Sequence, residues 1–404
     1  MRTQSDRLAY LDWMRGMAAA IMLQGHVFDG WLRPQDRTSE WFWLSQFMGG
    51  LPAPTFLFLV GVSLALVLDR MRSKGASTAN LIQRVVRRGA WILFLAYAFR
   101  IEQFLVWYPA SDWSGVFRVD TLNCIAACTL VIGLLSAAFP TRRTNITAMG
   151  MLAAVVVFTT PWIYPLRPPI SSFLLSYLNG NGQSYYFSIF PWVAFAFAGI
   201  TFGYALLAAR ESGKEGYFFD CIGVAGVWAY AAGETMNLFP GFRYGFFDYS
   251  LTSPQFFFVR LGWILLIVYG AYKWTKWRQP GRRSLFVIFG QASLLIYWVH
   301  IEMVYGRPFH GFAQSLGLAG VAINLLWIFP AMFGLAMARE THWSSWCQQL
   351  LFKTRRIRYR RFAREIFTYV SGWFASNRGP VAEQSDLAIG TAGKNHTRQI
   401  ALSD

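Results

Sequence analysis

The sequence predicts an all-α membrane protein, a polytopic bundle of about ten transmembrane helices whose two termini both lie in the cytoplasm. Three observations support this fold class. First, 55% of the 404 residues are hydrophobic and 14% are charged, a composition far from that of soluble domains. Second, apolar stretches of roughly 17–25 residues, long enough to cross the hydrocarbon, recur along the chain. Third, lysine and arginine gather in alternate loops, which is the positive-inside pattern.

The apolar stretches define the predicted elements in chain order. They lie near residues 8–30, 49–68, 86–107, 119–139, 146–164, 186–208, 217–239, 254–273, 285–305 and 317–337. The loops after the even-numbered stretches are rich in basic residues, as Arg70, Arg72 and Arg84 illustrate. We therefore place those loops, and with them both termini, in the cytoplasm.

The chain divides into three predicted parts. Residues 1–340 form the transmembrane domain, 341–376 a basic interfacial segment and 377–404 a disordered tail. The middle part contains the sequence TRRIRYRRFAR, a basic cluster suited to anionic lipid. Because the positive residues lie beside membrane stretches, the net charge of +17 indicates the lipid bilayer as a partner and not nucleic acid.

The first stretch carries the residues that are most suggestive of chemistry. It keeps Asp12 and Arg15 near its start and His26 near its end. In a helix, Arg15 and His26 would be roughly 16 Å apart along the axis and on about the same face, so they can line one cavity. Asp12 precedes Arg15 at ion-pair spacing. The alternative is that Arg15 reaches the lipid headgroups and that the imidazole of His26 makes its hydrogen bonds at the opposite membrane interface.

Other ionisable residues border the predicted outer ends of the stretches. They are Arg100, Glu102, Arg118, Asp120, Glu234, Arg260, His300 and Glu302. Burying so many charges costs several kcal/mol unless they pair around a hydrated pocket, so a shared site at the level of His26 is the economical interpretation. For any one of these residues, an ordinary polar position at the membrane–water interface is an equal alternative.

Four sequence blocks resemble a known family. They are Arg7-x4-Asp12-Trp-x-Arg15-Gly-x9-His26, Ala53-Pro-Thr-Phe-Leu-Phe-Leu-Val-Gly61, Val119-Asp120-Thr-Leu122 and Gly290-Gln-Ala-Ser-Leu-Leu-Ile-Tyr297-Trp-Val-His300. Over most of residues 7–305 the chain resembles the heparan-α-glucosaminide N-acetyltransferase catalytic domain family. It is also similar to the wider group of transmembrane acyltransferases, which includes acyltransferase-3 enzymes that modify bacterial surface polysaccharides.

The resemblance implies an integral enzyme of a bacterial inner membrane. It would move an acyl group, expected to be acetyl, from cytoplasmic acetyl-CoA to an amine or hydroxyl of a sugar or glycan outside. It implies that Arg15 belongs to the donor path and His26 to the catalytic centre. The lysosomal branch has its catalytic histidine in the first luminal loop, but residues 32–41 contain none, so His26 must take the role of base.

The residues then receive hypothetical roles. His26, titrating near pH 6.5, would deprotonate the acceptor as it attacks the thioester, or would itself be acylated transiently. Asp29, Asp120 or Glu302 could orient His26, and we count Asp120 and Glu302 as catalytic. The predicted substrate-binding residues are Asp12, Arg15, Asp29, Arg100, Arg260 and His300. The predicted contacts to coenzyme A, an anion, are Arg15, Arg84, Arg87 and Arg88.

Two rival interpretations come from other classes of protein. A secondary transporter would show inverted repeats, broken helices and ionisable groups near the midplane, whereas no repeat is visible here. A membrane protein without catalysis would leave the set Asp12, Arg15 and His26 unexplained. None of the four cysteines lies beside other potential metal ligands at a metal-binding spacing, so no metal is expected. The sequence does not choose between N- and O-acylation, nor between a monomer and a homo-oligomer.

Overall fold

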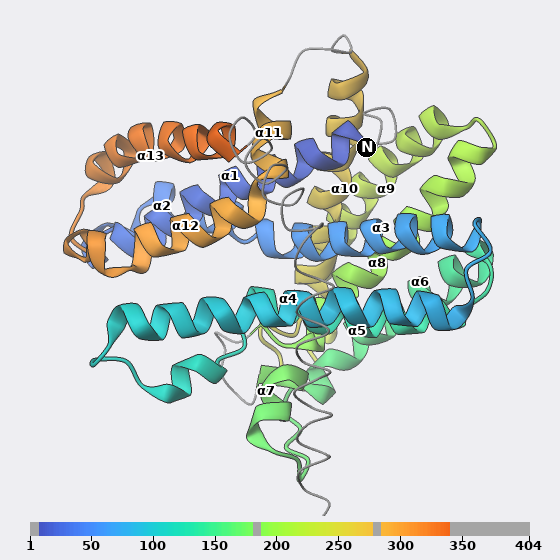
Figure 1. Ribbon diagram of the computed structural model, residues 1–404, viewed down its shortest axis with the longest axis horizontal. Coiled ribbons are helices and arrows are strands. Elements are labelled where there is room, and N and C mark those ends of the chain that lie inside the picture. The colour runs from blue at the N-terminus through green and yellow to red at the C-terminus, as the bar shows by residue number, and fades with distance from the viewer. Residues whose placement is uncertain (1–7, 181–186, 278–283, 340–404) are drawn as a thin grey trace, which may run out of the picture. The chain divides into compact units, whose positions relative to one another are not determined.

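The computed structural model describes residues 8–180, 187–277 and 284–339, and their long elements are all α-helices (Figure 1). The helices are α1 (Ala9–Trp31), α2 (Glu40–Gly49), α3 (Pro52–Arg72), α4 (Thr78–Trp107), α5 (Thr121–Ala138), α6 (Arg142–Ile163), α7 (Ser172–Asn179), α8 (Ile189–Glu211), α9 (Glu215–Asn237), α10 (Pro254–Trp277), α11 (Leu285–Gln291), α12 (Ser293–Tyr305) and α13 (Leu318–Ala338). The all-α fold class is confirmed. The predicted segments 341–376 and 377–404 lie outside the described residues.

Seven helical segments of the described chain are long and apolar enough to cross a membrane, and the pair α11 and α12 would be an eighth if it forms one span. The protein is therefore an integral membrane protein. A helix lies at each of the ten predicted positions, but α1 and α9 are not among the seven segments. The count of ten and the cytoplasmic termini stay predictions.

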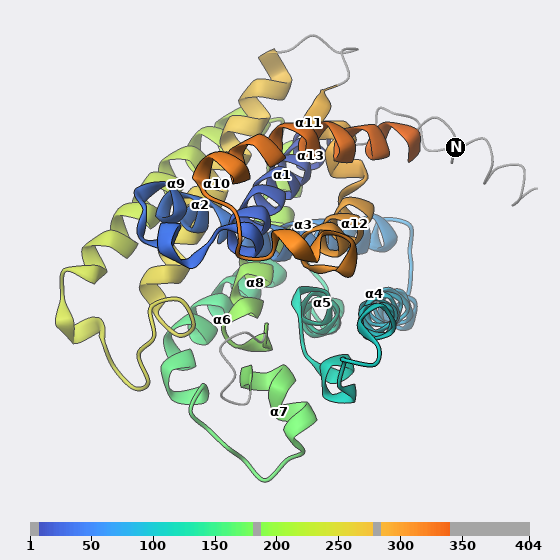
Figure 2. The same ribbon diagram turned by 90° about the vertical axis from the view of Figure 1, so that its left-hand side faces the viewer.

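Helix α1 packs into two buried clusters of hydrophobic side chains. Tyr10 and Met14 in its first half join a cluster that includes residues of α3, α8 and α10. Leu23 and Val27 in its second half join a cluster built with α11, α12 and α13. Figure 2 accordingly shows α1 between α10 and α12. The polar residues of α1 are thus held by contacts on both sides.

The predicted continuous stretch 285–305 is broken in the structure. Helices α11 and α12 meet at Ala292 with a bend of 81°. The bend lies where α11 crosses α1 at two glycines: a Cβ on Gly290 would lie 1.9 Å from the Asp12 carbonyl oxygen, and one on Gly16 would lie 1.8 Å from the Phe286 carbonyl oxygen. Only glycine permits backbones to approach so closely.

A second helix, α2, occupies the connection between the first two predicted stretches. Ser39 caps it by accepting a hydrogen bond from the Phe42 N–H at 3.3 Å. Helix α2 then crosses α1 where the Cα of Gly49 would lie 2.9 Å from a Cβ on Gly25. This close crossing places α2 beside the part of α1 that carries His26.

Candidate active site

The C-terminal half of α1 presents His26 to a second histidine on α12. The Nδ1 of His26 lies 2.8 Å from the Nε2 of His300, and the two ring planes are within 8° of parallel with their centroids 5.1 Å apart. His300 is fully buried, and its Nδ1 lies 2.7 Å from the carbonyl oxygen of Ile296. His26 is only partly buried, so it is the more accessible member of the pair.

These two distances determine where the protons sit on a neutral pair. A carbonyl oxygen only accepts, so the Nδ1–H of His300 must donate to Ile296. The Nε2 of a neutral His300 is then an acceptor, and the Nδ1–H of His26 donates to it. The Nε2 of His26 is left with a free lone pair. This hydrogen-bond chain, which we call the histidine relay, therefore exposes a base at one defined atom.

Asp29 is the predicted carboxylate that lies next to the relay. It follows His26 on α1 and is close enough to interact with the imidazole electrostatically. The hydroxyl of Tyr305 donates to Asp29 Oδ2 at 2.9 Å, and the Tyr305 ring packs edge-on against His26 with centroids 5.8 Å apart. The direct hydrogen-bond partner of His26 is nevertheless His300, which sequence reasoning assigned to substrate binding.

Asp120 and Arg100 meet in a buried ion pair. The Arg100 Nε lies 3.2 Å from Asp120 Oδ2, and the two side chains are 8% and 12% exposed. Asp120 also caps α5 by accepting from the Leu122 and Asn123 N–H groups. The structure thus brings together two predicted site residues, but it engages Asp120 with Arg100 and α5 and does not pair it with His26.

Glu302 lies beside a different partner. Its carboxyl group neighbours that of Glu102 on α4. Glu302 follows His300 by two positions, roughly 200° around the helix, so the two side chains leave α12 on different faces. Whether Glu302 is catalytic stays a prediction.

A hydroxyl network that the sequence did not reveal adjoins Asp120. The Tyr177 and Tyr97 hydroxyl oxygens are 2.7 Å apart, and the Asn123 Nδ2–H donates to Tyr177 at 2.9 Å. Burial raises the pKa of the Tyr177 phenol, so it stays protonated at neutral pH. Only the position of Asn123, three residues after a helix-capping Asp, could have signalled this network.

The N-terminal half of α1 holds the predicted ion pair. Arg15 Nη1 donates to Asp12 Oδ1 at 2.9 Å, and Arg15 Nη2 donates to Ser63 Oγ on α3 at 2.7 Å. Gln291, at the break between α11 and α12, donates to Asp12 Oδ2 at 3.4 Å. Arg15 thus reaches α3 whereas His26 reaches α12. One cavity lined by both residues stays a prediction.

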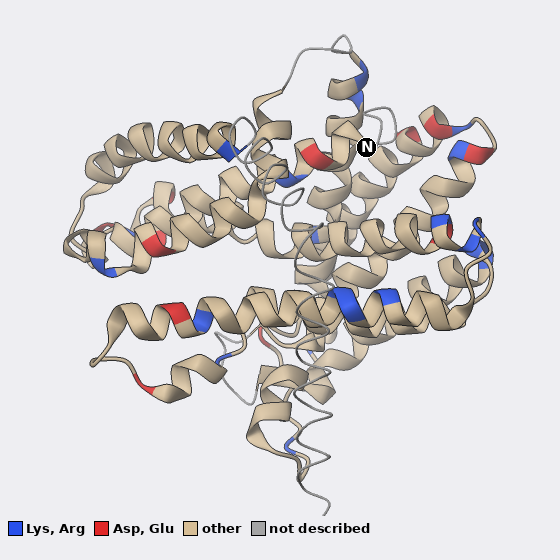
Figure 3. Cartoon of the chain, viewed as in Figure 1, with Lys and Arg blue, Asp and Glu red and all other residues tan. Residues whose placement is uncertain are grey.

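Another arginine, Arg88, lies near this ion pair. Arg88 on α4 is close enough to Arg15 and Arg84 for mutual repulsion, and its Nε is buried without a hydrogen-bond partner in the described part of the chain. Arg87 is exposed. Figure 3 shows both basic and acidic positions on α4. We call Arg15, Arg84 and Arg88 the arginine cluster. Its positive charge and unpaired donor fit an anionic ligand such as the phosphates of coenzyme A.

The family model described as heparan-α-glucosaminide N-acetyltransferase, catalytic, matches residues 7–228. The chain belongs to this family. Membership indicates a membrane acetyltransferase that acts on sugars. No curated protein matches the chain.

The match to the heparan-α-glucosaminide N-acetyltransferase family covers part of the site. His26, the arginine cluster and Asp120 lie within the matched residues, whereas His300 and Arg260 lie beyond them. The second half of the histidine relay therefore comes from a segment beyond the residues that the family model matches. Arg260 lies on α10, with its guanidinium over the rings of Phe47 and Phe256.

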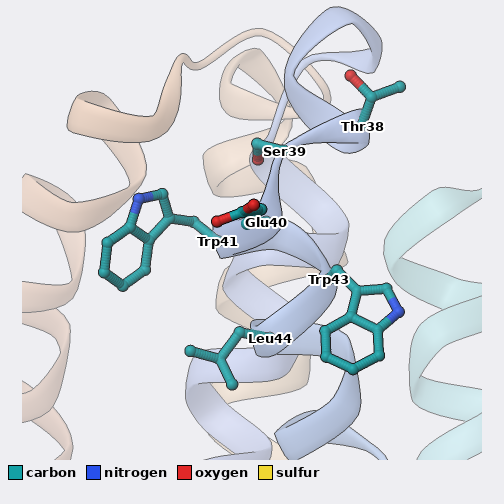
Figure 4. Close-up of a pocket in the computed structure, with 6 residues that line it drawn as sticks. All are labelled: Thr38, Ser39, Glu40, Trp41, Trp43 and Leu44. Atoms are coloured by element: carbon teal, nitrogen blue, oxygen red, sulfur yellow. The ribbon is translucent and has the colours of Figure 1, made fainter.

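The structure also contains a surface pocket of about 600 Å³ after the end of α1. Its lining residues are Thr38, Ser39, Glu40, Trp41, Trp43 and Leu44 (Figure 4). Trp41 and Trp43 are 68% and 69% exposed and point away from each other. Exposed tryptophans of this kind are typical of a membrane–water interface. No predicted site residue lines the pocket, and no group of three or more potential metal ligands occurs in the described residues.

Proposed function

We propose that this family member transfers an acetyl group from acetyl-CoA in the cytoplasm to an amine or hydroxyl of a sugar or glycan on the other side of the membrane. The observation that carries the proposal is the histidine relay, because it leaves the Nε2 of His26 unprotonated. Such an atom is what acyl transfer to a neutral amine or alcohol requires. The location in a bacterial inner membrane is part of the proposal.

The proposed reaction needs one proton to move. The acceptor nitrogen or oxygen attacks the thioester carbonyl while His26 Nε2 takes its proton, and the C–S bond then breaks as the thiolate leaves. His26 returns the proton to that thiolate. Asp29 stabilises the imidazolium electrostatically. His300 acts as a positioning residue, since it is fully buried and fixes the tautomer of His26. Transient acetylation of the same Nε2 is the alternative.

The arginine cluster would hold the donor. Arg15 and Arg88 would bind the phosphates of coenzyme A, with Arg84 beside them and the exposed Arg87 attracting the anion from solution. The pantetheine arm would cover the roughly 16 Å between Arg15 and His26. We propose this path because Arg88 retains a buried donor with no partner in the described residues.

A secondary transporter is the second candidate, because the bent pair α11 and α12 is a broken helix of the kind that transporters use. The break lies beside Asp12, where Gln291 donates to the carboxylate. Acyl transfer explains both the relay and the family, so we favour it.

The test is transfer of label from radioactive acetyl-CoA to a panel of amino sugars and neutral sugars by the purified protein. We expect His26→Ala to lower the transfer rate by at least about a hundredfold, the range for loss of a general base. His310→Ala is the matched control, because the His310 ring packs against Trp107 and is not a member of the relay. It should leave transfer unchanged. Wild-type transfer by His26→Ala would refute the assignment.

A further inference from the structure

Arg260 is a buried cation on α10 without a carboxylate partner among the described residues. It is 7% exposed. Its Nη1 donates to the carbonyl oxygen of Phe47 at 2.6 Å, and its guanidinium carbon lies 4.6 Å from the centroid of the Phe47 ring. A buried positive charge without a carboxylate partner is costly, so the position of this guanidinium needs explanation.

Two further unpaired donors belong to residues near Arg260. Trp263 follows Arg260 by three positions, hence on the same face of α10, and its ring centroid is 6.4 Å from that of Phe47. Gln46 directly precedes Phe47 on α2. The Nε1 of Trp263 and the Nε2 of Gln46 are both buried without a hydrogen-bond partner among the described residues. Buried donors of this kind are rare unless a ligand or water meets them.

A purely structural role explains only part of this arrangement. Arg260 binds a carbonyl in the last turn of α2, where a cation is favourable, and a Cβ on Gly50 would lie 2.7 Å from its Nη2. That role uses Nη1. It gives no reason for the unpaired N–H groups of Trp263 and Gln46, which would cost stability in a site that never holds an acceptor.

We propose that Arg260, Trp263 and Gln46 form a binding site for an oxyanion, a carboxylate or phosphate group. The three side chains offer one positive charge and N–H donors, which matches the acceptor-only chemistry of an oxyanion. Arg260 and Trp263 lie outside the residues that the family model matches. We call this group of three the oxyanion site.

The oxyanion site lies at the His26 end of α1. Gln24 Nε2 donates to Ser45 Oγ at 2.5 Å, so α2 is tied to α1 two positions before His26. An oxyanion on the acceptor sugar could thus be held beside the reacting amine or hydroxyl, and this part of the inference rests on the proposed function. The same oxyanion chemistry is available from the phosphate of a lipid headgroup.

The test is equilibrium binding to the purified full chain in an uncharged, phosphate-free detergent, without acetyl-CoA. The probes are glucuronate, glucosamine 6-phosphate, neutral glucose and added phosphatidylglycerol. We expect Arg260→Gln to weaken oxyanion binding roughly tenfold to a hundredfold, as loss of a hydrogen bond to a charge does. Arg243→Gln, which alters an exposed arginine over Phe247, is the matched control and should bind like the wild type.

Trp263→Phe separates a ligand site from a structural one. Removing an unpaired buried donor should keep or raise the thermal midpoint of the ligand-free protein, yet weaken oxyanion binding about tenfold. Trp228→Phe is its control, because Trp228 is 71% exposed on α9. If Arg260→Gln does not fold, binding by Trp263→Phe tests the proposal.

The outcomes separate the sources of the oxyanion. Tight binding of glucuronate or glucosamine 6-phosphate, weakened in both variants, supports an anionic acceptor. Stabilisation by phosphatidylglycerol alone, weakened in both variants, supports the site with lipid as its occupant and overturns the acceptor. Binding of no probe, or equal binding by wild type and variants, overturns the site. Because no transfer is measured, these results are independent of the role of His26.

Discussion

The two ends of α1 carry different kinds of polar side chain. At the His26 end, two imidazoles and a carbonyl oxygen form a hydrogen-bond chain that carries no formal charge when neutral. At the Arg15 end, a carboxylate and three arginines gather with an excess of positive charge. The first arrangement suits the movement of a proton, and the second suits the binding of an anion. One helix therefore separates the proposed base from the proposed donor-binding arginines.

The largest effect should come from the buried half of the relay. We expect His300→Phe to lower kcat about a hundredfold, because His26 loses the acceptor that fixes its tautomer. His300→Gln should recover part of that loss, since its amide oxygen can accept from His26 Nδ1 and its amide N–H can donate. Steady-state kinetics with acetyl-CoA in excess measure both. Equal kcat values for Phe and Gln variants that are folded would show that His300 only fills space.

A moderate effect should follow at the opposite end. Arg88→Gln should raise the KM for acetyl-CoA about tenfold with little change in kcat, because a charge-assisted contact to the donor is lost. Arg87→Gln, at an exposed position, should raise KM less and only at low ionic strength. The pair of variants is compared by KM and kcat at two salt concentrations. A fall in kcat alone for Arg88→Gln would contradict the separation of the two ends.

The smallest effect should come from a residue that accepts a hydrogen bond from Arg15. Ser63→Ala removes one hydrogen bond to Nη2 while the ion pair with Asp12 remains. We expect the KM for acetyl-CoA to rise about threefold, as for a single partly compensated hydrogen bond. Thr147→Ala is a matched control, because its hydroxyl only bonds to its own helix. A large loss of kcat in Ser63→Ala would link Arg15 to the chemical step.

Local patterns predicted some of this structure from sequence. The helix positions followed from apolar stretches, and the Asp12–Arg15 ion pair followed from a spacing of three within one helix. His26 was singled out because an ionisable residue within a membrane stretch is by default a candidate for function. Each of these inferences needs only residues that are neighbours in the chain or on one helix.

Long-range contacts decided the rest. His26 and His300 are 274 positions apart, and no local pattern pairs them. The bend at Ala292 coincides with the crossing of α1 and α11 at two glycines. No proline lies there from which the bend could have been predicted. The same limit hid the partner of Glu302, because its neighbour Glu102 belongs to another helix. Pairing across helices depends on tertiary packing, which a single sequence does not display.

The most direct measurement of the central claim is the tautomer of His26, by nitrogen NMR of protein labelled at its five histidines. At neutral pH we expect His26 to be protonated at Nδ1 and bare at Nε2, with a signal that disappears in His26→Gln. The same tautomer should be found at His300, where Nδ1 donates to Ile296. A His26 that carries its proton on Nε2, or on both nitrogens, would contradict the claim that this atom is the base.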